Sequence, residues 1–113
     1  MAITIYHNPR CSKSRQTLEI LERSGVQFRV IEYLNEPLGG AEIKSLLKKL
    51  RLSASDLVRR KEAIFKEAGL ENADEQALVA AMATHPILIE RPIVENDGRA
   101  IIGRPPENVN ALL

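Results

Sequence analysis

The sequence predicts an α/β fold built on a mixed four-stranded sheet. Three observations indicate this class: a strand–helix–strand pattern at the start, a run of helical segments in the middle, and an Asp-Gly turn between two β-rich runs near the end. The first pattern predicts parallel strands joined by a right-handed crossover. The last is typical of an antiparallel hairpin, so the sheet should contain both kinds of pairing.

The strand–helix–strand unit occupies the first 31 residues. Residues 3–6 are mostly β-branched or aromatic and predict a short strand. A helix then runs to about Ser24, where Gly25 can stop it. Residues 26–31 alternate apolar and polar side chains and form the second predicted strand. The helical residues that recur at the expected spacing are Ser14, Thr17, Leu18 and Leu21.

The central part of the chain, about residues 39–85, is predicted to be a helical insertion. Isoleucine and leucine residues trace one face of a first amphipathic helix in this part. Two polar pairs mark later helix starts. Ser53 with Asp56 resembles a capping box, and Asn72 with Glu75 could cap the last of these helices.

The end of the chain returns to strands. Residues 93–95 and 99–102 flank Asn-Asp-Gly and predict a hairpin, and residues 103–106 lead into a last helical segment. The order β-α-β, helical insertion, β-β-α is that of a thioredoxin-like fold with an insertion between its halves. Because no repeat, low-complexity segment or linker is present, we expect residues 1–113 to form a single domain.

Composition restricts the classes of function. Sixteen Lys and Arg against 15 Asp and Glu give a net charge of +1, which argues against a general nucleic-acid binder. No apolar run has transmembrane length and no signal-peptide layout is present, so we expect no membrane attachment. The single cysteine excludes an internal disulfide, and no cluster has metal-ligand spacing, so we expect no metal. The expected compartment is the reducing cytoplasm.

That cysteine, Cys11, lies on the turn where the first strand becomes the first helix. Free backbone N–H groups and the helix dipole favour the reactive thiolate there. Lys13, Arg15 and His7 would add positive potential. Ser14 would either donate a hydrogen bond to the sulfur or face the core. A lone cysteine is usually a small buried hydrophobe, but this polar, basic turn favours a nucleophile.

Three stretches resemble the glutaredoxin-dependent arsenate reductases. They are residues 3–15, with a His-x-x-x-Cys-x-x-x-Arg pattern, residues 85–94 (His-Pro-Ile-Leu-Ile-Glu-Arg-Pro-Ile-Val) and residues 101–105 (Ile-Ile-Gly-Arg-Pro). Their order and spacing agree with the family over essentially the whole chain. The resemblance implies a thioredoxin-like fold and the reduction of arsenate to arsenite by the thiolate of Cys11. The expected ligand of the site is arsenate or a similar oxyanion.

Arginine suits oxyanion binding because its planar fork donates two hydrogen bonds at once. The thioredoxin order by itself places Arg91 beside the first turn, since it opens the third strand. The resemblance implies that Arg59, Arg91 and Arg104 bind the oxyanion and that His7 belongs to the site. Arg60 could take the role of Arg59 after a shift of one residue.

The cis or trans state of the peptide bonds before the prolines can also be predicted. In thioredoxin-like folds a cis-proline opens the third strand, so we expect the Arg91–Pro92 bond to be cis. We expect trans bonds at Pro86, Pro105 and Pro106.

The source of electrons follows from the cysteine count. Because position 14 is Ser, no Cys-x-x-Cys pair can resolve an adduct on Cys11, and an outside thiol is required. The resemblance implies glutathione as co-substrate and glutaredoxin as partner, without a bound cofactor. We expect a monomer.

Two alternatives remain open at this point. One is a thioredoxin-fold transcriptional regulator that binds RNA polymerase, although Ser14 stands where such proteins typically carry a second cysteine. The other is a glutathione-linked thiol reductase with a substrate other than arsenate.

Overall fold

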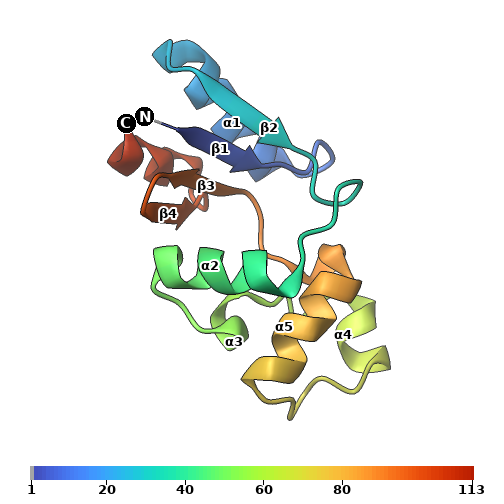
Figure 1. Ribbon diagram of the computed structural model, residues 1–113. Helices are drawn as coiled ribbons and strands as arrows, with labels where there is room; N and C mark the ends of the chain where they lie inside the picture. Colours follow the sequence, from blue (N-terminus) through green and yellow to red (C-terminus); the bar gives the residue numbers. More distant parts are fainter. Residues whose placement is uncertain (1) are drawn as a thin grey trace. The chain divides into compact units, whose positions relative to one another are not determined.

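A computed structural model describes residues 2–113 and divides the chain into two compact units (Figure 1). Unit 1 combines the N-terminal part up to Glu36 with Arg91–Leu113, and unit 2 comprises Pro37–Glu90. Unit 2 therefore contains the segment that the sequence predicts to be inserted. That the chain forms one domain stays a prediction. No helix within residues 2–113 is both long enough and apolar enough to cross a membrane.

Unit 1 is built on a mixed four-stranded sheet, which confirms the predicted fold class. The strand order is β2-β1-β3-β4, with β1 and β2 parallel and the other two pairs antiparallel. The elements of unit 1 are β1 (Ile3–Tyr6), α1 (Ser12–Ser24), β2 (Phe28–Ile31), β3 (Ile93–Asn96), β4 (Arg99–Ile102) and the 3-10 helix η2 (Pro106–Leu112).

One face of this sheet carries the core of unit 1. Side chains of β1 and β3 pack there against α1 and η2. At the far end of α1, Gly25 ends the helix with a φ of 77°, a backbone conformation that glycine adopts readily. The central strands are therefore held from that side by two helical elements. The buried cluster comprises Ile3, Ile5, Leu21, Val94, Val109 and Leu112.

The hairpin of unit 1 forms where the sequence predicts it. β3 continues to Asn96, and Asp97 adopts a φ of 55° in the turn before β4. β2 begins at Phe28 instead of residue 26, because its parallel pairing with β1 starts only at the Ile3–Phe28 pair.

Unit 2 is helical. α2 presents Ile43, Leu46 and Leu47 as its buried face, as its amphipathic pattern predicts. α3 ends at Leu57, and the next residue, Val58, pairs with Ile89 in an isolated antiparallel bridge. The elements of unit 2 are α2 (Gly40–Leu50), α3 (Ala54–Leu57), α4 (Ala63–Glu67), α5 (Glu75–Thr84) and the 3-10 helix η1 (Pro86–Leu88).

Helix starts in unit 2 confirm one predicted cap and correct another. The N–H of Ser53 donates to Asp56 Oδ2 at 3.1 Å, as in the predicted capping box. The cap of α5 is Asp74 and not Asn72, because the Asp74 carboxylate reaches the N–H of Ala77 at 2.9 Å. Glu75 does not cap α5, since both its carboxylate oxygens accept the N–H of Ala54 at the start of α3.

Candidate active site

Cys11 is the residue that directly precedes α1. Its backbone is extended (φ −95°, ψ 123°), and its N–H donates to the main-chain oxygen of Asn8 at 3.0 Å. Asn8 is buried, and its side-chain oxygen accepts the N–H of Arg10 at 3.0 Å. Asn8 thus closes the turn from within and leaves Cys11 half-buried beside the first free N–H groups of the helix.

The pKa of the Cys11 thiol lies below its ordinary value. Burial acts in the opposite direction, since it disfavours the charged thiolate. It is outweighed by hydrogen bonds to the sulfur from the N–H of Ser14, the guanidinium groups of Arg91 and Arg104, and the N–H of Lys13. Helix-terminal N–H groups and cationic side chains therefore act together on this sulfur.

Arg104 makes the contact that closes the site. Its Nη1 lies 3.6 Å from Cys11 Sγ and also donates to the main-chain oxygen of Arg91 at 3.1 Å. A single guanidinium nitrogen of Arg104 therefore bridges the sulfur of Cys11 and the main chain of Arg91. The structure brings Cys11, Arg91 and Arg104 together, although the first two are 80 positions apart in the sequence.

Gly103 and Thr17 support this arrangement, and the sequence analysis gave neither of them a role in the site. A Cβ atom at Gly103 would lie 2.5 Å from Thr17 Oγ1 and 2.8 Å from Pro92 Cγ. The N–H of Gly103 donates to the main-chain oxygen of Pro92 at 2.9 Å. Thr17 is fully buried, and its hydroxyl donates to Lys13 O at 2.8 Å. A glycine directly before Arg104 was the signal that could have identified this close approach.

Two peptide bonds at the site are cis. The Arg91–Pro92 bond is cis, and so is the Arg104–Pro105 bond. The expectation of a trans bond at Pro105 is therefore wrong. Because X–Pro bonds favour trans by only about 0.5–1 kcal/mol, local packing decides between the two forms.

His7 and Ser14 form a buried pair beneath the turn. His7 Nδ1 and Ser14 Oγ are 2.7 Å apart, and the same oxygen accepts the N–H of Asn8 at 3.0 Å. The Ser14 hydroxyl is therefore engaged with His7 and Asn8, and the group that reaches Cys11 is the backbone N–H of Ser14. The pair positions the turn from which the sulfur projects.

The charge expected on His7 is disfavoured by its surroundings. Burial lowers the pKa of His7, the Glu32 carboxylate acts in the opposite direction, and Arg15 lowers the pKa further. Since the net shift is downward from about 6.5, the neutral imidazole dominates near pH 7. Arg15 itself donates from Nη1 to the main-chain oxygen of Pro9 at 2.9 Å and so braces the turn.

Arg59 lies in unit 2 and is held there by two carboxylates. Its Nε donates to Glu62 Oε2 at 3.0 Å, and its Nη1 donates to Glu90 Oε1 at 2.6 Å. Its neighbour Arg60 lies over the ring of Phe65, with 5.3 Å from Cζ to the ring centroid. A role for either arginine in oxyanion binding stays a prediction.

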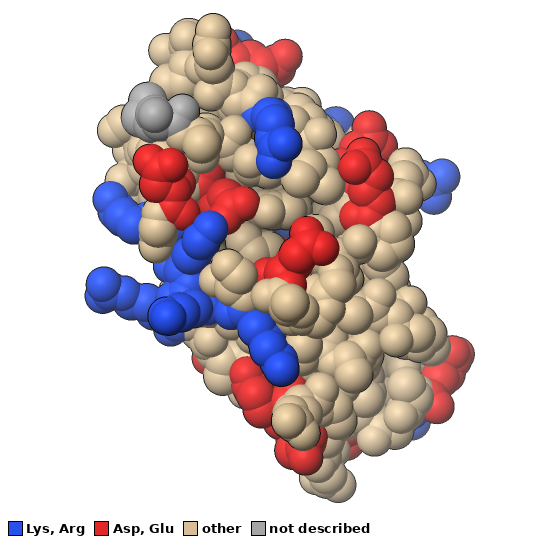
Figure 2. Space-filling model, in the orientation of Figure 1, with Lys and Arg blue, Asp and Glu red and all other residues tan. Residues whose placement is uncertain are grey.

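Among residues 2–113, no group of three or more His, Cys, Asp or Glu side chains is arranged to hold a metal ion. The face seen in Figure 2 carries acidic as well as basic side chains, in keeping with the near balance of charges in the sequence.

Comparison with known proteins places this geometry in a family. The model of the ArsC family matches residues 6–112. A protein of Neisseria meningitidis serogroup A named "Arsenate reductase" is 48% identical, and the match covers 98% of this chain and 97% of the relative. A protein of Escherichia coli K12 named "Uncharacterized protein YfgD" is 50% identical over 95% of this chain and 92% of its own length.

A solved structure with the same name is similar to this chain in both sequence and fold. The structure titled "Arsenate reductase from Vibrio cholerae" is 47% identical and superposes with a TM-score of 0.95, covering 100% of this chain and 98% of that one. Because both the family model and relatives near 48% identity span almost the whole chain, the protein belongs to the ArsC family.

Proposed function

We propose that the protein is an arsenate reductase that uses Cys11 as its only protein thiol and glutathione with glutaredoxin as electron donors. The observation that carries the proposal is the convergence of Arg91 and Arg104 on the sulfur of Cys11. Two guanidinium groups and the N–H groups of a helix start around one thiolate suit a nucleophile whose substrate is an oxyanion. The relatives named as arsenate reductases supply the identity of that oxyanion.

In the first step, arsenate occupies the position beside the sulfur, with its oxygens on Arg91 and Arg104. The Cys11 thiolate attacks arsenic, an S–As bond forms, and one arsenate oxygen leaves as water after protonation. Arsenic remains in the pentavalent state, since no electrons have yet passed to it. The two arginines balance the negative charge that the thiolate and the oxyanion bring together.

In the second step, the thiolate of glutathione attacks the sulfur of Cys11. A mixed disulfide forms, and the electron pair of the S–As bond leaves with arsenic as arsenite. A second glutathione, through glutaredoxin, then reduces the mixed disulfide and restores Cys11. The balance is one arsenate and two glutathione molecules converted to arsenite, glutathione disulfide and water.

The outside thiol is required because Cys11 has no second cysteine in its chain. Glutathione keeps thiols reduced in the cytoplasm, and we place the reaction there. We also propose that the protein acts as a monomer. Without an internal disulfide, the oxidised intermediate of this mechanism is a mixed disulfide on Cys11.

The test is a coupled assay with arsenate, glutathione and a glutaredoxin, in which arsenite is measured directly. Cys11→Ser should abolish turnover. Arg91→Lys and Arg104→Lys keep the charge but lose the fork, so each should lower kcat/KM for arsenate by roughly 10-fold or more. Arg99→Lys, at an exposed position on β4 in the same unit, is the matched control and should behave like wild type.

Two outcomes would contradict the proposal. Absence of arsenite formation by the wild-type protein would remove arsenate as the substrate. Full activity with thioredoxin alone, and no glutathione adduct on Cys11 by mass spectrometry, would remove the proposed electron donors.

A further inference from the structure

A hollow of about 350 Å³ lies in unit 1 against the turn that carries Cys11. One wall is formed by residues 7–10, and the other by Glu32, Leu34 and Asn35 from the turn after β2. Its volume falls at the lower end of the range of small-molecule sites, roughly 300–1,000 Å³. The mechanism described above gives this hollow no task.

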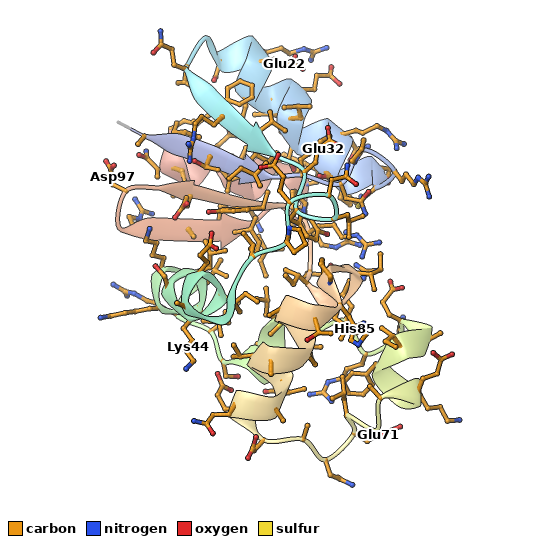
Figure 3. All side chains as sticks on the ribbon, turned by 45° about the vertical axis from the view of Figure 1, so that its right-hand side comes forward. Glu22, Glu32, Lys44, Glu71, His85 and Asp97 are labelled. Carbon is orange, nitrogen blue, oxygen red and sulfur yellow. The ribbon has the colours of Figure 1, made fainter. Side chains whose placement is uncertain are left out.

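Glu32 supplies negative charge at one wall. Its main-chain oxygen accepts the N–H groups of Asn35 and Glu36, each at 2.9 Å, and its Oε1 accepts Asn35 Nδ2 at 3.4 Å. The tight turn thus fixes the base of a side chain that remains exposed (Figure 3). Glu32 also acts electrostatically on His7, which lines the same hollow, because its carboxylate opposes the effect of burial on the pKa of His7.

Arg10 supplies positive charge at the facing wall. Its backbone is fixed by the hydrogen bond from its N–H to Asn8 Oδ1, while its side chain is exposed. Among residues 2–113, no carboxylate forms an ion pair with Arg10. Because Arg10 and Glu32 both line the hollow, a ligand there lies beside one basic and one acidic residue.

This pair of charges complements the end of an α-amino acid, where an ammonium and a carboxylate share one carbon atom. We propose that the hollow binds the γ-glutamyl end of glutathione, with the ammonium on Glu32 and the α-carboxylate on Arg10. The inference rests on the proposed function, which makes glutathione the co-substrate. Leu34 offers an apolar contact for the methylene groups of the glutamyl side chain.

Reach from the hollow to Cys11 is sufficient for this role. Arg10 and Cys11 are consecutive, so their Cα atoms are about 3.8 Å apart. An extended tripeptide spans about 10 Å, which allows the thiol of a ligand anchored at Arg10 to approach the sulfur of Cys11. The hollow would hold the incoming thiol while Arg91 and Arg104 hold the oxyanion.

Binding is tested on the Cys11→Ser protein with S-methylglutathione, so that no covalent adduct forms. Titration calorimetry should give a Kd that rises about 10-fold in Glu32→Gln and in Arg10→Gln, since each loses one charge-assisted hydrogen bond. Glu36→Gln, on the same turn but outside the hollow, is the matched control and should bind like the parent.

Kinetics with Cys11 present provide the second arm. Glu32→Gln should raise KM for glutathione about 10-fold with KM for arsenate unchanged, and it should leave turnover with cysteinylglycine, which lacks the γ-glutamyl group, unaltered. Unchanged affinity and KM for glutathione in both hollow variants, with arsenate reduction intact, would overturn the inference and leave the proposed function standing. If S-methylglutathione binds in a charge-dependent way but arsenate is not reduced, the binding role of the hollow is supported and the proposed function is contradicted.

Discussion

The sulfur of Cys11 is subject to opposing influences of its surroundings. Half-burial disfavours a charge, whereas four hydrogen-bond donors favour it, two from the backbone of α1 and two from arginine side chains. The donors prevail, so the pKa of the thiol is lowered. The lowered pKa increases the thiolate fraction at neutral pH, and it does so without a cationic histidine.

We expect alkylation of Cys11 by iodoacetamide to show a pH midpoint below that of a free thiol, about 8.5. Removal of one guanidinium in Arg104→Ala should raise this midpoint, because one of the four donors is lost. Mass spectrometry of the alkylated protein gives the extent of reaction at each pH. A wild-type midpoint at or above the free-thiol value would contradict the lowered pKa.

Ser14 should matter more for stability than its size suggests. Ser14→Ala would leave the N–H of Asn8 and Nδ1 of His7 buried without their shared partner. Each such loss costs about 1–3 kcal/mol, so the free energy of unfolding in urea should fall by at least that amount. Ser24→Ala, at an exposed position at the end of α1, should cost clearly less.

At the scale of elements, the site depends on how closely α1 approaches the segment after β4. Gly103 touches Thr17 on α1 and Pro92 directly before β3, with no space for a further methyl group. This contact fixes the residue that immediately precedes Arg104. The distance between Cys11 and Arg104 is therefore set by packing between elements and not by the arginine alone.

Gly103→Ala should force these elements apart. Overpacking typically costs about 1–3 kcal/mol, and we expect a lower free energy of unfolding together with a higher alkylation midpoint of Cys11. The control is Gly98→Ala, where a Cβ atom would meet nothing within 4 Å and the backbone is not left-handed. Equal behaviour of the two variants in urea unfolding and alkylation would show that the close approach has no role.

The cap of α5 offers a separate test in unit 2. Asp74→Ala removes the acceptor for the N–H of Ala77 and should lower the free energy of unfolding by about 1 kcal/mol. Asn72→Ala, at the position that the sequence first suggested, should have little effect. The reverse order in urea denaturation would restore Asn72 as the cap.

Local patterns predicted what local physics determines. The strand at 3–6, the stop at Gly25, the cap at Ser53 and the turn at Asp97 each depend on neighbouring residues, and the structure confirms them. Asn72 and Asp74 are both good caps two positions apart, so propensity could not separate them.

Contacts between residues far apart in the sequence were outside the reach of local patterns. The contact of Thr17 with Gly103 joins residues 86 positions apart, and the ion pair of Arg59 with Glu90 joins residues 31 positions apart. The neutral state preferred by His7 follows from burial, which only the fold reveals.

At the scale of the whole molecule, the chain leaves unit 1 after Glu36 and returns at Arg91. Cys11 comes from the first segment of unit 1, whereas Arg91 and Arg104 come from the second. The part of the pKa lowering that comes from the two guanidinium groups therefore exists only when the two segments have joined in one sheet. Alkylation rate at neutral pH is accordingly a measure of native unit 1 as well as of chemistry.

The distribution of aromatic residues gives the two units different optical signals. The chain has no tryptophan and two tyrosines, Tyr6 and Tyr33, which are both buried and both lie in unit 1. Four of the five α-helices lie in unit 2 among the described residues. Tyrosine fluorescence during urea unfolding should thus follow unit 1 alone, while circular dichroism at 222 nm is weighted towards unit 2. Coincident transitions are expected for the single cooperative domain that the sequence predicts, and a helical transition at lower urea would reveal an insertion that melts independently.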